Sequence, residues 1–176
     1  GCGNMGLPML NSMVLKNIDA KGYDIENKES LSALGTNFES CKKSFLTDRN
    51  VIISVVRDEE DTLELCQGSD GLFEQQSSKI LIVSSTLSPR FLMDLKNRAP
   101  KNIILIDAPM SGATIAAKES KLTFMVGCKK NFFVYVAPLL GLMGNQINRI
   151  GNYGAGMMVK VLNNFIAASS VVSVRH

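Results

Sequence analysis

The stretch Gly1-Cys2-Gly3-Asn4-Met5-Gly6 decides the fold, because it matches the pattern G-x-G-x-x-G. In that pattern the first glycine makes a tight turn, the second lets the backbone approach a pyrophosphate, and the third allows close packing of the helix that follows. The N-terminus of this helix then attracts the phosphates. The motif is weak when it stands alone, and a glycine-rich loop without a ligand is the alternative. The opening residues therefore indicate a dinucleotide-binding turn that the rest of the chain has to support.

Asp24 supports this interpretation through its spacing. It lies 18 residues after Gly6, at the end of a predicted strand over residues 18–24. A carboxylate at this place can accept hydrogen bonds from the hydroxyls of the adenosine ribose, and it repels a 2′-phosphate. Ile25 follows it where an NADP enzyme often has arginine. The sequence thus favours NAD over NADP, although Lys28 is near enough in sequence to leave NADP as the alternative.

Short apolar runs rich in valine and isoleucine alternate with segments of helical pattern. The runs predict buried strands, and the segments between them predict helices. The predicted strands cover residues 18–24, 51–57, 80–84, 103–108 and 122–126, and the predicted helices cover 7–16, 58–66, 89–96 and 131–142. Ser88 and Pro89 supply a cap and a first turn for the third of these helices. Such alternation predicts an α/β fold of the Rossmann type, with a mainly parallel sheet and helices on both faces.

A long final helix is predicted after Gly156, where apolar residues recur at helical spacing. These residues extend around more than one face, so we expect a second chain or a further domain to pack there. The chain accordingly divides into a nucleotide-binding domain, residues 1–153, and the start of an interdomain helix, residues 154–176. Because the glycine turn should follow a strand, we also expect that the first strand and the native N-terminus are missing before Gly1.

Composition excludes several other classes of function. Hydrophobic residues make up 45% and charged residues 20% of the 176 residues, and the net charge is only +3, so we expect no nucleic-acid or membrane partner. The longest nearly apolar stretch, residues 132–143, is too short to span a bilayer. The four cysteines lie far apart and the single histidine is His176, which gives poor ligands for a metal. This cysteine usage fits a reducing compartment, so we expect the cytoplasm, with the mitochondrial matrix as an alternative.

Lys160 and Asn164 form a second candidate site. They are four positions apart on the predicted final helix, so their side chains point the same way. A lysine partly stripped of water has a lowered pKa and can take a proton from a hydroxyl, while an asparagine beside it can hold that hydroxyl or a carboxylate. The alternative is a solvated lysine next to a helix-capping asparagine.

Five motifs in order resemble those of the β-hydroxyacid dehydrogenase family. They are GCGNMGLPM at residues 1–9, STLSP at 85–89, DAPMSG at 107–112, LTFMVG at 122–127 and GAGMMVKVLNN at 154–164. The similarity extends over nearly the whole chain. It is strongest to the 3-hydroxyisobutyrate dehydrogenases and their tartronate semialdehyde, succinic semialdehyde and L-threonate relatives.

The resemblance implies a role for particular residues. It places the nucleotide loop on Gly1, Gly3, Asn4, Met5 and Gly6, the ribose acid on Asp24, and further cofactor contacts on Val56 and Thr86. It also implies that Ser111 and Gly112 bind the carboxylate of the substrate, that Lys160 is the catalytic lysine, and that Asn164 orients the substrate. Asn163 would have only a supporting role, and Ser85 and Thr86 as ordinary turn hydroxyls remain the alternative.

Four positions depart from the pattern of the family. Ala113, Ala116, Ser120 and Cys128 stand where the family usually has glycine. Each adds a Cβ where a close approach or a positive φ could be needed, which would alter the substrate loop. The alternative is that these positions have ordinary backbone angles.

The resemblance further implies an all-helical C-terminal domain, absent here, through which the family forms homo-oligomers. The expected function is NAD-dependent oxidation of a short β-hydroxy acid to its semialdehyde, or the reverse reduction, with Lys160 as the general acid/base. A non-catalytic dinucleotide-binding or regulatory module is the first alternative. An interaction domain that docks a partner through the final helix is the second.

Overall fold

The computed structural model describes residues 1–26, 31 and 35–174, and these residues form an α/β fold around a mixed sheet. Its strands are β1 (Val51–Ser54), β2 (Lys79–Val83), β3 (Ile103–Asp107), β4 (Met110–Ser111), β5 (Leu122–Gly127) and β6 (Gly144–Gly151). The order is β1-β2-β3-β5-β4, and β6 also pairs with β5. Strands β1, β2 and β3 are parallel, as are β5 and β6, whereas β5 runs antiparallel to β3 and β4. The predicted Rossmann-type fold is therefore confirmed, with an antiparallel step in its middle.

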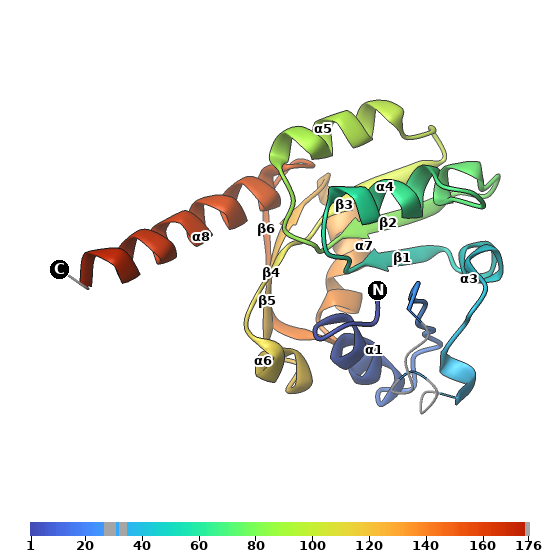
Figure 1. Ribbon diagram of the computed structural model, residues 1–176, viewed down its shortest axis with the longest axis horizontal. Helices are drawn as coiled ribbons and strands as arrows, with labels where there is room; N and C mark the ends of the chain where they lie inside the picture. Colours follow the sequence, from blue (N-terminus) through green and yellow to red (C-terminus); the bar gives the residue numbers. More distant parts are fainter. Residues whose placement is uncertain (27–30, 32–34, 175–176) are drawn as a thin grey trace.

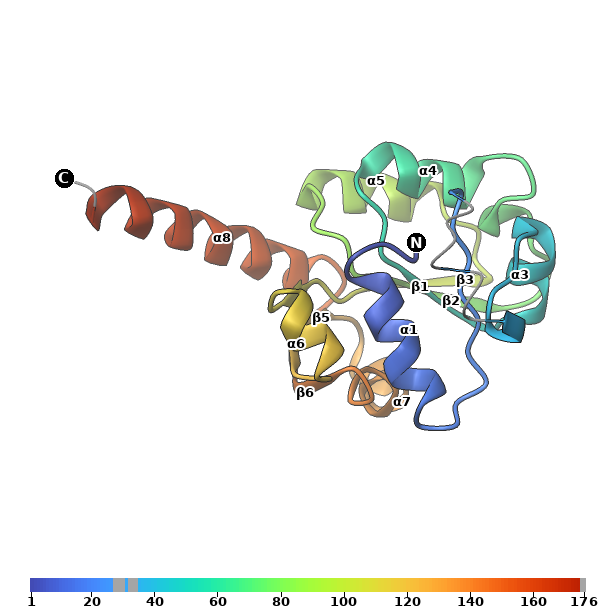
Figure 2. The ribbon, with the colours of Figure 1, turned by 60° about the horizontal axis from the view of Figure 1, so that its bottom comes forward.

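Helices cover both faces of this sheet (Figures 1 and 2). They are α1 (Gly6–Val14), α3 (Lys42–Asp48), α4 (Glu59–Gln67), α5 (Pro89–Arg98), α6 (Thr114–Lys118), α7 (Lys130–Leu140) and α8 (Ala155–Val174), with short 3-10 helices η1 (Gly35–Asn37) and η2 (Leu72–Glu74). The ribbon views place α4 and α5 on one face, with α1 and α7 on the other. The predicted arrangement of helices on both faces is confirmed.

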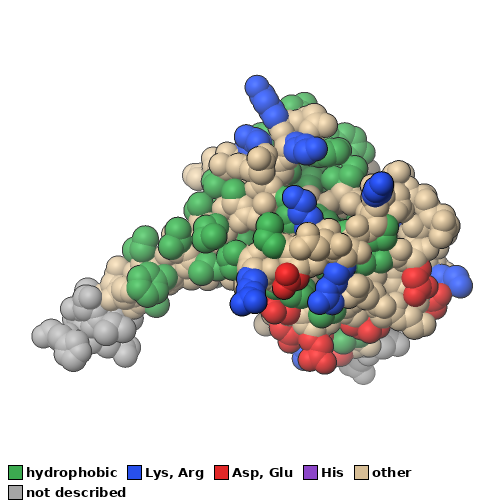
Figure 3. All heavy atoms as spheres, turned by 90° about the horizontal axis from the view of Figure 1, so that it is seen from above, with side chains coloured by type: hydrophobic (Ala, Val, Ile, Leu, Met, Phe, Trp, Pro, Cys, Tyr) green, Lys and Arg blue, Asp and Glu red, His purple; other side chains and the backbone are tan. Residues whose placement is uncertain are grey.

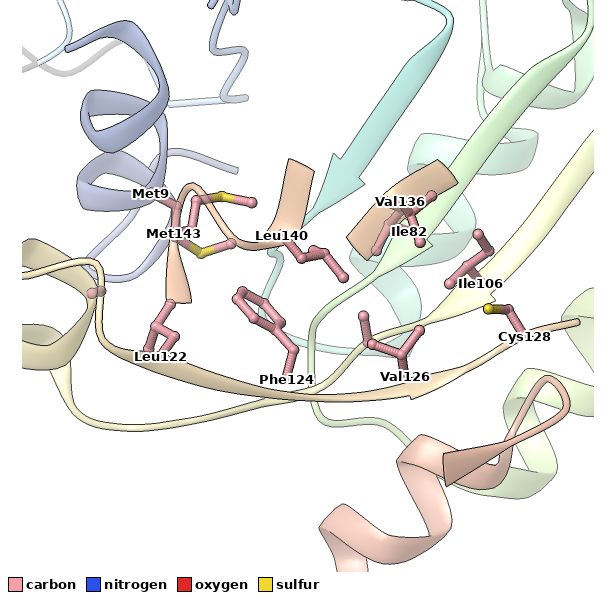
Figure 4. Close-up of a cluster of buried hydrophobic side chains, with 12 residues drawn as sticks. Met9, Ile82, Ile106, Leu122, Phe124, Val126, Cys128, Val136, Leu140 and Met143 are labelled. Atoms are coloured by element: carbon pink, nitrogen blue, oxygen red, sulfur yellow. The ribbon is translucent and has the colours of Figure 1, made fainter. Parts of the chain in front are cut away.

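The pleat of the strands divides the core between the two faces. Ile82 of β2 points into a cluster with α1 and α7, to which β5 contributes Phe124 (Figure 4). Its neighbours Leu81 and Val83 point the other way, into the cluster under α4 and α5. Because successive side chains of a strand alternate between faces, a continuous apolar run is what a strand buried on both faces requires.

Helix ends agree with the capping signals of the sequence. Ser88 caps α5 by accepting a hydrogen bond from the Phe91 N–H, and Pro89 occupies the first turn. Asp58 caps α4 in the same way, through the Asp61 N–H at 2.9 Å. Such caps satisfy N–H groups that have no partner within the helix.

The prediction of a strand over residues 18–24 is wrong. Only Gly22 makes a bridge, to Phe38, and a cavity separates this segment from β1. A strand needs a neighbour along its length, and here the backbone has one for a single residue, a glycine whose lack of a side chain also weakens a strand. The segment is an irregular connection that nevertheless delivers Asp24 to the glycine loop.

The final helix is confirmed, since α8 runs over 20 residues from Ala155. Its first turn is buried at Gly156 and Met157, and residues 161–170 are exposed. Figure 1 shows the rest of α8 leaving the domain. Among the described helices, α8 included, none combines the length and hydropathy needed to cross a membrane.

Candidate functional site

The glycine loop meets the steric demands of its motif. A Cβ on Gly6 would overlap the carbonyl of Gly1, and a Cβ on Gly1 would overlap the carbonyl of Val55. A Cβ on Gly3, in contrast, would meet no atom within 4 Å. The first and third glycines therefore pack backbone against backbone, and the second leaves open space where a pyrophosphate can approach. The residues present fit a dinucleotide.

Asp24 lies next to this loop. Its Oδ2 accepts a hydrogen bond from the Cys2 N–H at 2.6 Å, and its Oδ1 accepts one from the Glu26 N–H at 2.9 Å. The carboxylate is thus tied to the second residue of the glycine motif, although the segment that carries it is not a strand. This is the place where a ribose next to the pyrophosphate would be bound.

A cavity of about 900 Å³ joins these elements. The predicted cofactor residues that line it are Gly1, Gly3, Asn4, Met5, Gly6, Asp24 and Val56. Beyond this polar end, the cavity continues along the free edge of β1 between apolar side chains such as Met9, Met13 and Leu139. The residues expected to bind a nucleotide thus gather at the end of the cavity formed by the glycine loop.

Val56 is held by Ser85, for which an ordinary turn hydroxyl was the alternative from the sequence. The Oγ of Ser85 donates a hydrogen bond to the Val56 carbonyl at 2.8 Å and accepts one from the Val56 N–H at 2.9 Å. Ser85 is buried and therefore fastens the segment after β1 to the end of β2. The next residue, Thr86, is exposed and does not line the cavity.

The predicted substrate loop, Ser111 and Gly112, leads into α6, which packs against α1. Ser111 pairs with Thr123 of β5, and Gly112 has a φ of +124°, a value that favours glycine. The hydroxyl of Thr114 lies 3.9 Å from the sulfur of Met5 in the glycine loop. Ser111 and Gly112 therefore lie near the glycine loop but do not line the cavity.

Among the four departures from the family pattern, a positive φ occurs at Ser120 alone. Its φ is +55°, and its hydroxyl bonds the Ser12 hydroxyl of α1 at 3.0 Å. Ala113 has ordinary extended angles, and Ala116 and Cys128 are absent from the positive-φ residues of the described chain. The loop therefore keeps its close contact with α1 despite the added Cβ atoms.

Lys160 projects from α8 just beyond the point where this helix is anchored. Gly156 lies against the carbonyl of Met125 in β5, and the sulfur of Met157 accepts a hydrogen bond from the Leu87 N–H at 3.3 Å. Lys160 is partly buried, and desolvation lowers the pKa of its amine. Within the described part of the chain the amine has no hydrogen-bond or ion-pair partner. Lys160 therefore loses its proton at a lower pH than a lysine on an open surface.

Two connections relate Lys160 to the other predicted residues. Leu87 directly follows Thr86, so α8 touches the loop after β2. Strand β5 contacts α8 at Met125 and pairs with Ser111 two residues earlier. Asn163 and Asn164 are exposed on α8, and neither they nor Lys160 line the cavity.

One residue of the site, Asp107, was quoted within a motif but given no role. It is buried at the end of β3, where its carboxylate bonds the first turn of α8. Burial raises its pKa to about 6. An acid at the end of a predicted buried strand is the signal that could have singled it out.

Paired substitutions should separate the roles of the glycines. Gly6→Ala should destabilise the fold, because its Cβ has no room beside the Gly1 carbonyl. Gly3→Ala should leave the Tm unchanged and weaken NAD binding at least about tenfold, because its Cβ would stand where the pyrophosphate approaches. Thermal unfolding and calorimetric titration with NAD would measure both. Equal NAD affinity in Gly3→Ala and the unmodified chain would exclude a pyrophosphate at this loop.

Comparison with known proteins supplies the family. Residues 1–154 match the model described as the NAD binding domain of 6-phosphogluconate dehydrogenase. The mitochondrial 3-hydroxyisobutyrate dehydrogenase of Rattus norvegicus is 30% identical over 176 residues, which cover 98% of this chain and 52% of the relative. The 3-hydroxyisobutyrate dehydrogenase of Pseudomonas aeruginosa is 29% identical over 94% of this chain and 57% of its own. The chain thus spans about half the length of the curated relatives it matches.

Solved structures agree with the sequence comparison. The 3-hydroxyisobutyrate dehydrogenase of Mycobacterium tuberculosis, solved with L-serine, superposes with a TM-score of 0.88 at 26% identity, over 99% of this chain and 60% of that one. An imine reductase from Myxococcus stipitatus, in complex with NAD⁺, reaches a TM-score of 0.89 at 15% identity, which shows a shared fold alone. Because the family model matches most of its residues, the chain belongs to the β-hydroxyacid dehydrogenase family and carries the NAD-binding domain of the 6-phosphogluconate dehydrogenase type.

Proposed function

We propose that the chain carries the nucleotide site and the proton-transfer residue of an NAD-dependent dehydrogenase. The reaction is oxidation of a short β-hydroxy acid to its semialdehyde, or the reverse reduction. The observation that supports this most is the place of Lys160, a partly buried amine that has no charged partner among the described residues. Its helix contacts the loop of Thr86 and the strand beside Ser111. The relatives named 3-hydroxyisobutyrate dehydrogenase support the substrate class.

In the oxidation, neutral Lys160 takes the proton of the substrate hydroxyl. Desolvation favours the neutral amine, which is the form that can accept a proton. The Ser111 hydroxyl and the backbone at Gly112 bind the carboxylate of the substrate, and Asn164, one turn beyond Lys160, orients it. When bound, the nicotinamide supplies the acceptor for the hydride.

The nucleotide itself is held by the glycine loop, Asp24, Val56 and Thr86. We propose NAD as the preferred cofactor, because a carboxylate next to the ribose repels a 2′-phosphate. The bonds from Asp24 to the Cys2 and Glu26 N–H groups hold this charge in place.

The cofactor preference can be tested at Asp24. Asp24→Asn keeps an oxygen to accept the Cys2 N–H and removes the charge, so the ratio of NADP to NAD affinity should rise at least about tenfold. Calorimetric titration with each nucleotide would measure it. Glu39→Gln, on the other side of the Gly22 bridge and outside the cavity, is the matched control. An unchanged ratio would mean that Asp24 does not select the cofactor.

A non-catalytic dinucleotide-binding module is the second candidate. It is favoured by the fact that Thr86, Ser111, Lys160 and Asn164 lie outside the cavity formed by the glycine loop. Stopped-flow absorbance with NAD and a panel of β-hydroxy acids separates the two. Hydride transfer supports the dehydrogenase, and tight NAD binding without any transfer supports the module.

The chain also divides into a part that holds the glycine loop and a helix that carries Lys160, and this division is part of the proposal. We propose residues 1–153 as the nucleotide-binding domain and residues 154–176 as the start of an interdomain helix. Figure 3 shows hydrophobic side chains along α8, and Met158, Leu162, Phe165 and Ile166 are all at least half exposed. Such a surface suits a helical domain or a second subunit, so we propose a homo-oligomer.

The named relatives include mitochondrial enzymes, and either the cytoplasm or the mitochondrial matrix suits this chemistry.

A further inference from the structure

The carboxylate of Asp107 reaches from the end of β3 to the first turn of α8. Its side chain is fully buried. Oδ1 accepts a hydrogen bond from the Gly154 N–H at 2.6 Å, and Oδ2 accepts one from the Met157 N–H at 2.7 Å. Bonds this short are typical of an ionised acceptor. One side chain from the sheet thus satisfies two of the N–H groups that a helix N-terminus leaves without a partner.

The surroundings of Asp107 are shaped for a carboxylate. A Cβ on Gly127 would overlap it, and a Cβ on Gly156 would come within 2.9 Å of Oδ2. Gly154 has a φ of +94°, which a glycine adopts without strain. Glycines from β5 and α8 therefore make the room that the acid occupies.

The contacts that hold α8 are concentrated in its first turn, where Gly156 lies against the Met125 carbonyl and Met157 is buried. Residues 161–170 are exposed, and the helix leaves the domain (Figure 1). In the described chain, the other side-chain hydrogen bond between its first turn and a separate element joins the Leu87 N–H to the sulfur of Met157, which is a weak acceptor. Beside this packing, Asp107 supplies the two strongest side-chain hydrogen bonds to the first turn of α8 within the described chain.

We propose that Asp107 is a positioning residue that sets the rotation of α8 and thereby holds the Lys160 amine in its desolvated place. The proposal rests on the proposed function for the importance of that amine. Lys160 is three positions after Met157 and so lies on the same side of the helix. Because Lys160 is partly buried, a rotation of α8 at its anchored turn changes how much of the amine solvent reaches.

The direct test measures the titration of Lys160 by NMR on the whole chain, with and without Asp107→Asn. Asparagine has nearly the same volume but offers a single oxygen, so one of the two backbone N–H groups loses its acceptor. The control is Asp58→Asn, an exposed helix cap on α4 that contacts neither α8 nor the cavity. Amide exchange at Gly154 and Met157 is recorded on the same samples.

In Asp107→Asn, and not in the control, we expect the lowered pKa of Lys160 to rise toward that of a solvated lysine. Amide exchange at Gly154 or Met157 should become at least about tenfold faster. With NAD and a β-hydroxy acid that the unmodified chain oxidises, kcat of Asp107→Asn should fall at least about tenfold while NAD affinity stays unchanged. The pKa seen in the pH profile of kcat should shift together with the pKa of Lys160. An unshifted Lys160 titration in a folded Asp107→Asn chain would overturn the proposal. Absence of hydride transfer in the unmodified chain would instead count against the proposed function, because the titration does not depend on activity.

The unmodified chain offers a second perturbation if Asp107→Asn fails to fold. Below about pH 6 Asp107 takes up a proton and loses one good acceptor. Cys128 and Tyr153, the titratable side chains that sense its charge, stay protonated there because burial raises the pKa of both. The protection of Gly154 or Met157 against exchange, corrected for the intrinsic pH dependence, should fall between pH 7 and pH 5. Constant protection over this range would overturn the proposal.

Discussion

Lys160→Ala should lower the rate of hydride transfer by about 10² to 10⁴-fold and leave NAD affinity unchanged. A positioned general base contributes this much to a proton transfer, and Lys160 lies outside the cavity lined by the glycine loop. Stopped-flow measurement of NADH formation would give the rate, and calorimetric titration the affinity. Lys96→Ala is the matched control, because Lys96 is an exposed lysine on α5.

The pH dependence adds a second readout to the same substitution. The oxidation requires neutral Lys160, so its rate should fall as the pH drops through the pKa of this amine. Because desolvation lowers that pKa, the fall should occur below the usual lysine value of about 10.4. The Lys160→Ala chain should lose this limb of the profile. A variant that keeps both the rate and the limb would remove Lys160 from the mechanism.

Phe124→Ala should lower the free energy of unfolding by about 3–5 kcal/mol. Phe124 is fully buried in the cluster shown in Figure 4, between strand β5 and helix α7. Removing its ring leaves a cavity that the surrounding side chains fill only in part. Its strand also pairs with Met110, next to Ser111, so the loss reaches the predicted substrate loop.

Urea denaturation would measure this change, and Val134→Ala is its control. Val134 lies on α7 with 68% of its surface exposed, so its truncation should change the free energy of unfolding by no more than about 0.5 kcal/mol. Similar losses in the two variants would mean that the cluster around Phe124 does not carry the stability of the domain.

Much of the fold could be predicted from the sequence, because its central strands are short, apolar and buried on both faces. Strands β2 and β3 and helix α5 lie within a residue or two of the predicted ranges. Other elements gave no such signal. Strand β6 contains Asn145, Gln146 and Asn148 and has few apolar positions, and β4 has only two residues. The short helices α3 and α6 were missed for the same reason, since five to seven residues show little periodicity.

Within the candidate site, the glycine loop could be predicted from the sequence better than the residues that support it. The glycine loop could be predicted from a short motif, and the demand at Gly6 is local, since its Cβ would meet the carbonyl of Gly1 five residues earlier. The supports of the site could not, because they depend on long-range contacts. Ser85 bonds Val56 across 29 positions, and Asp107 bonds Met157 across 50. Such pairings follow from the order of the strands, which local patterns leave open.

A crystal structure with NAD and a β-hydroxy acid bound would test the central claim most directly, namely that Lys160 and the glycine loop serve one reaction. The account predicts the Lys160 amine within about 2.6–3.2 Å of the substrate hydroxyl. It also predicts the carbinol carbon about 3–3.5 Å from the nicotinamide ring of a nucleotide held at Gly3 and Asp24. A nucleotide bound at the loop with its nicotinamide remote from Lys160, and the lysine directed into solvent, would contradict it.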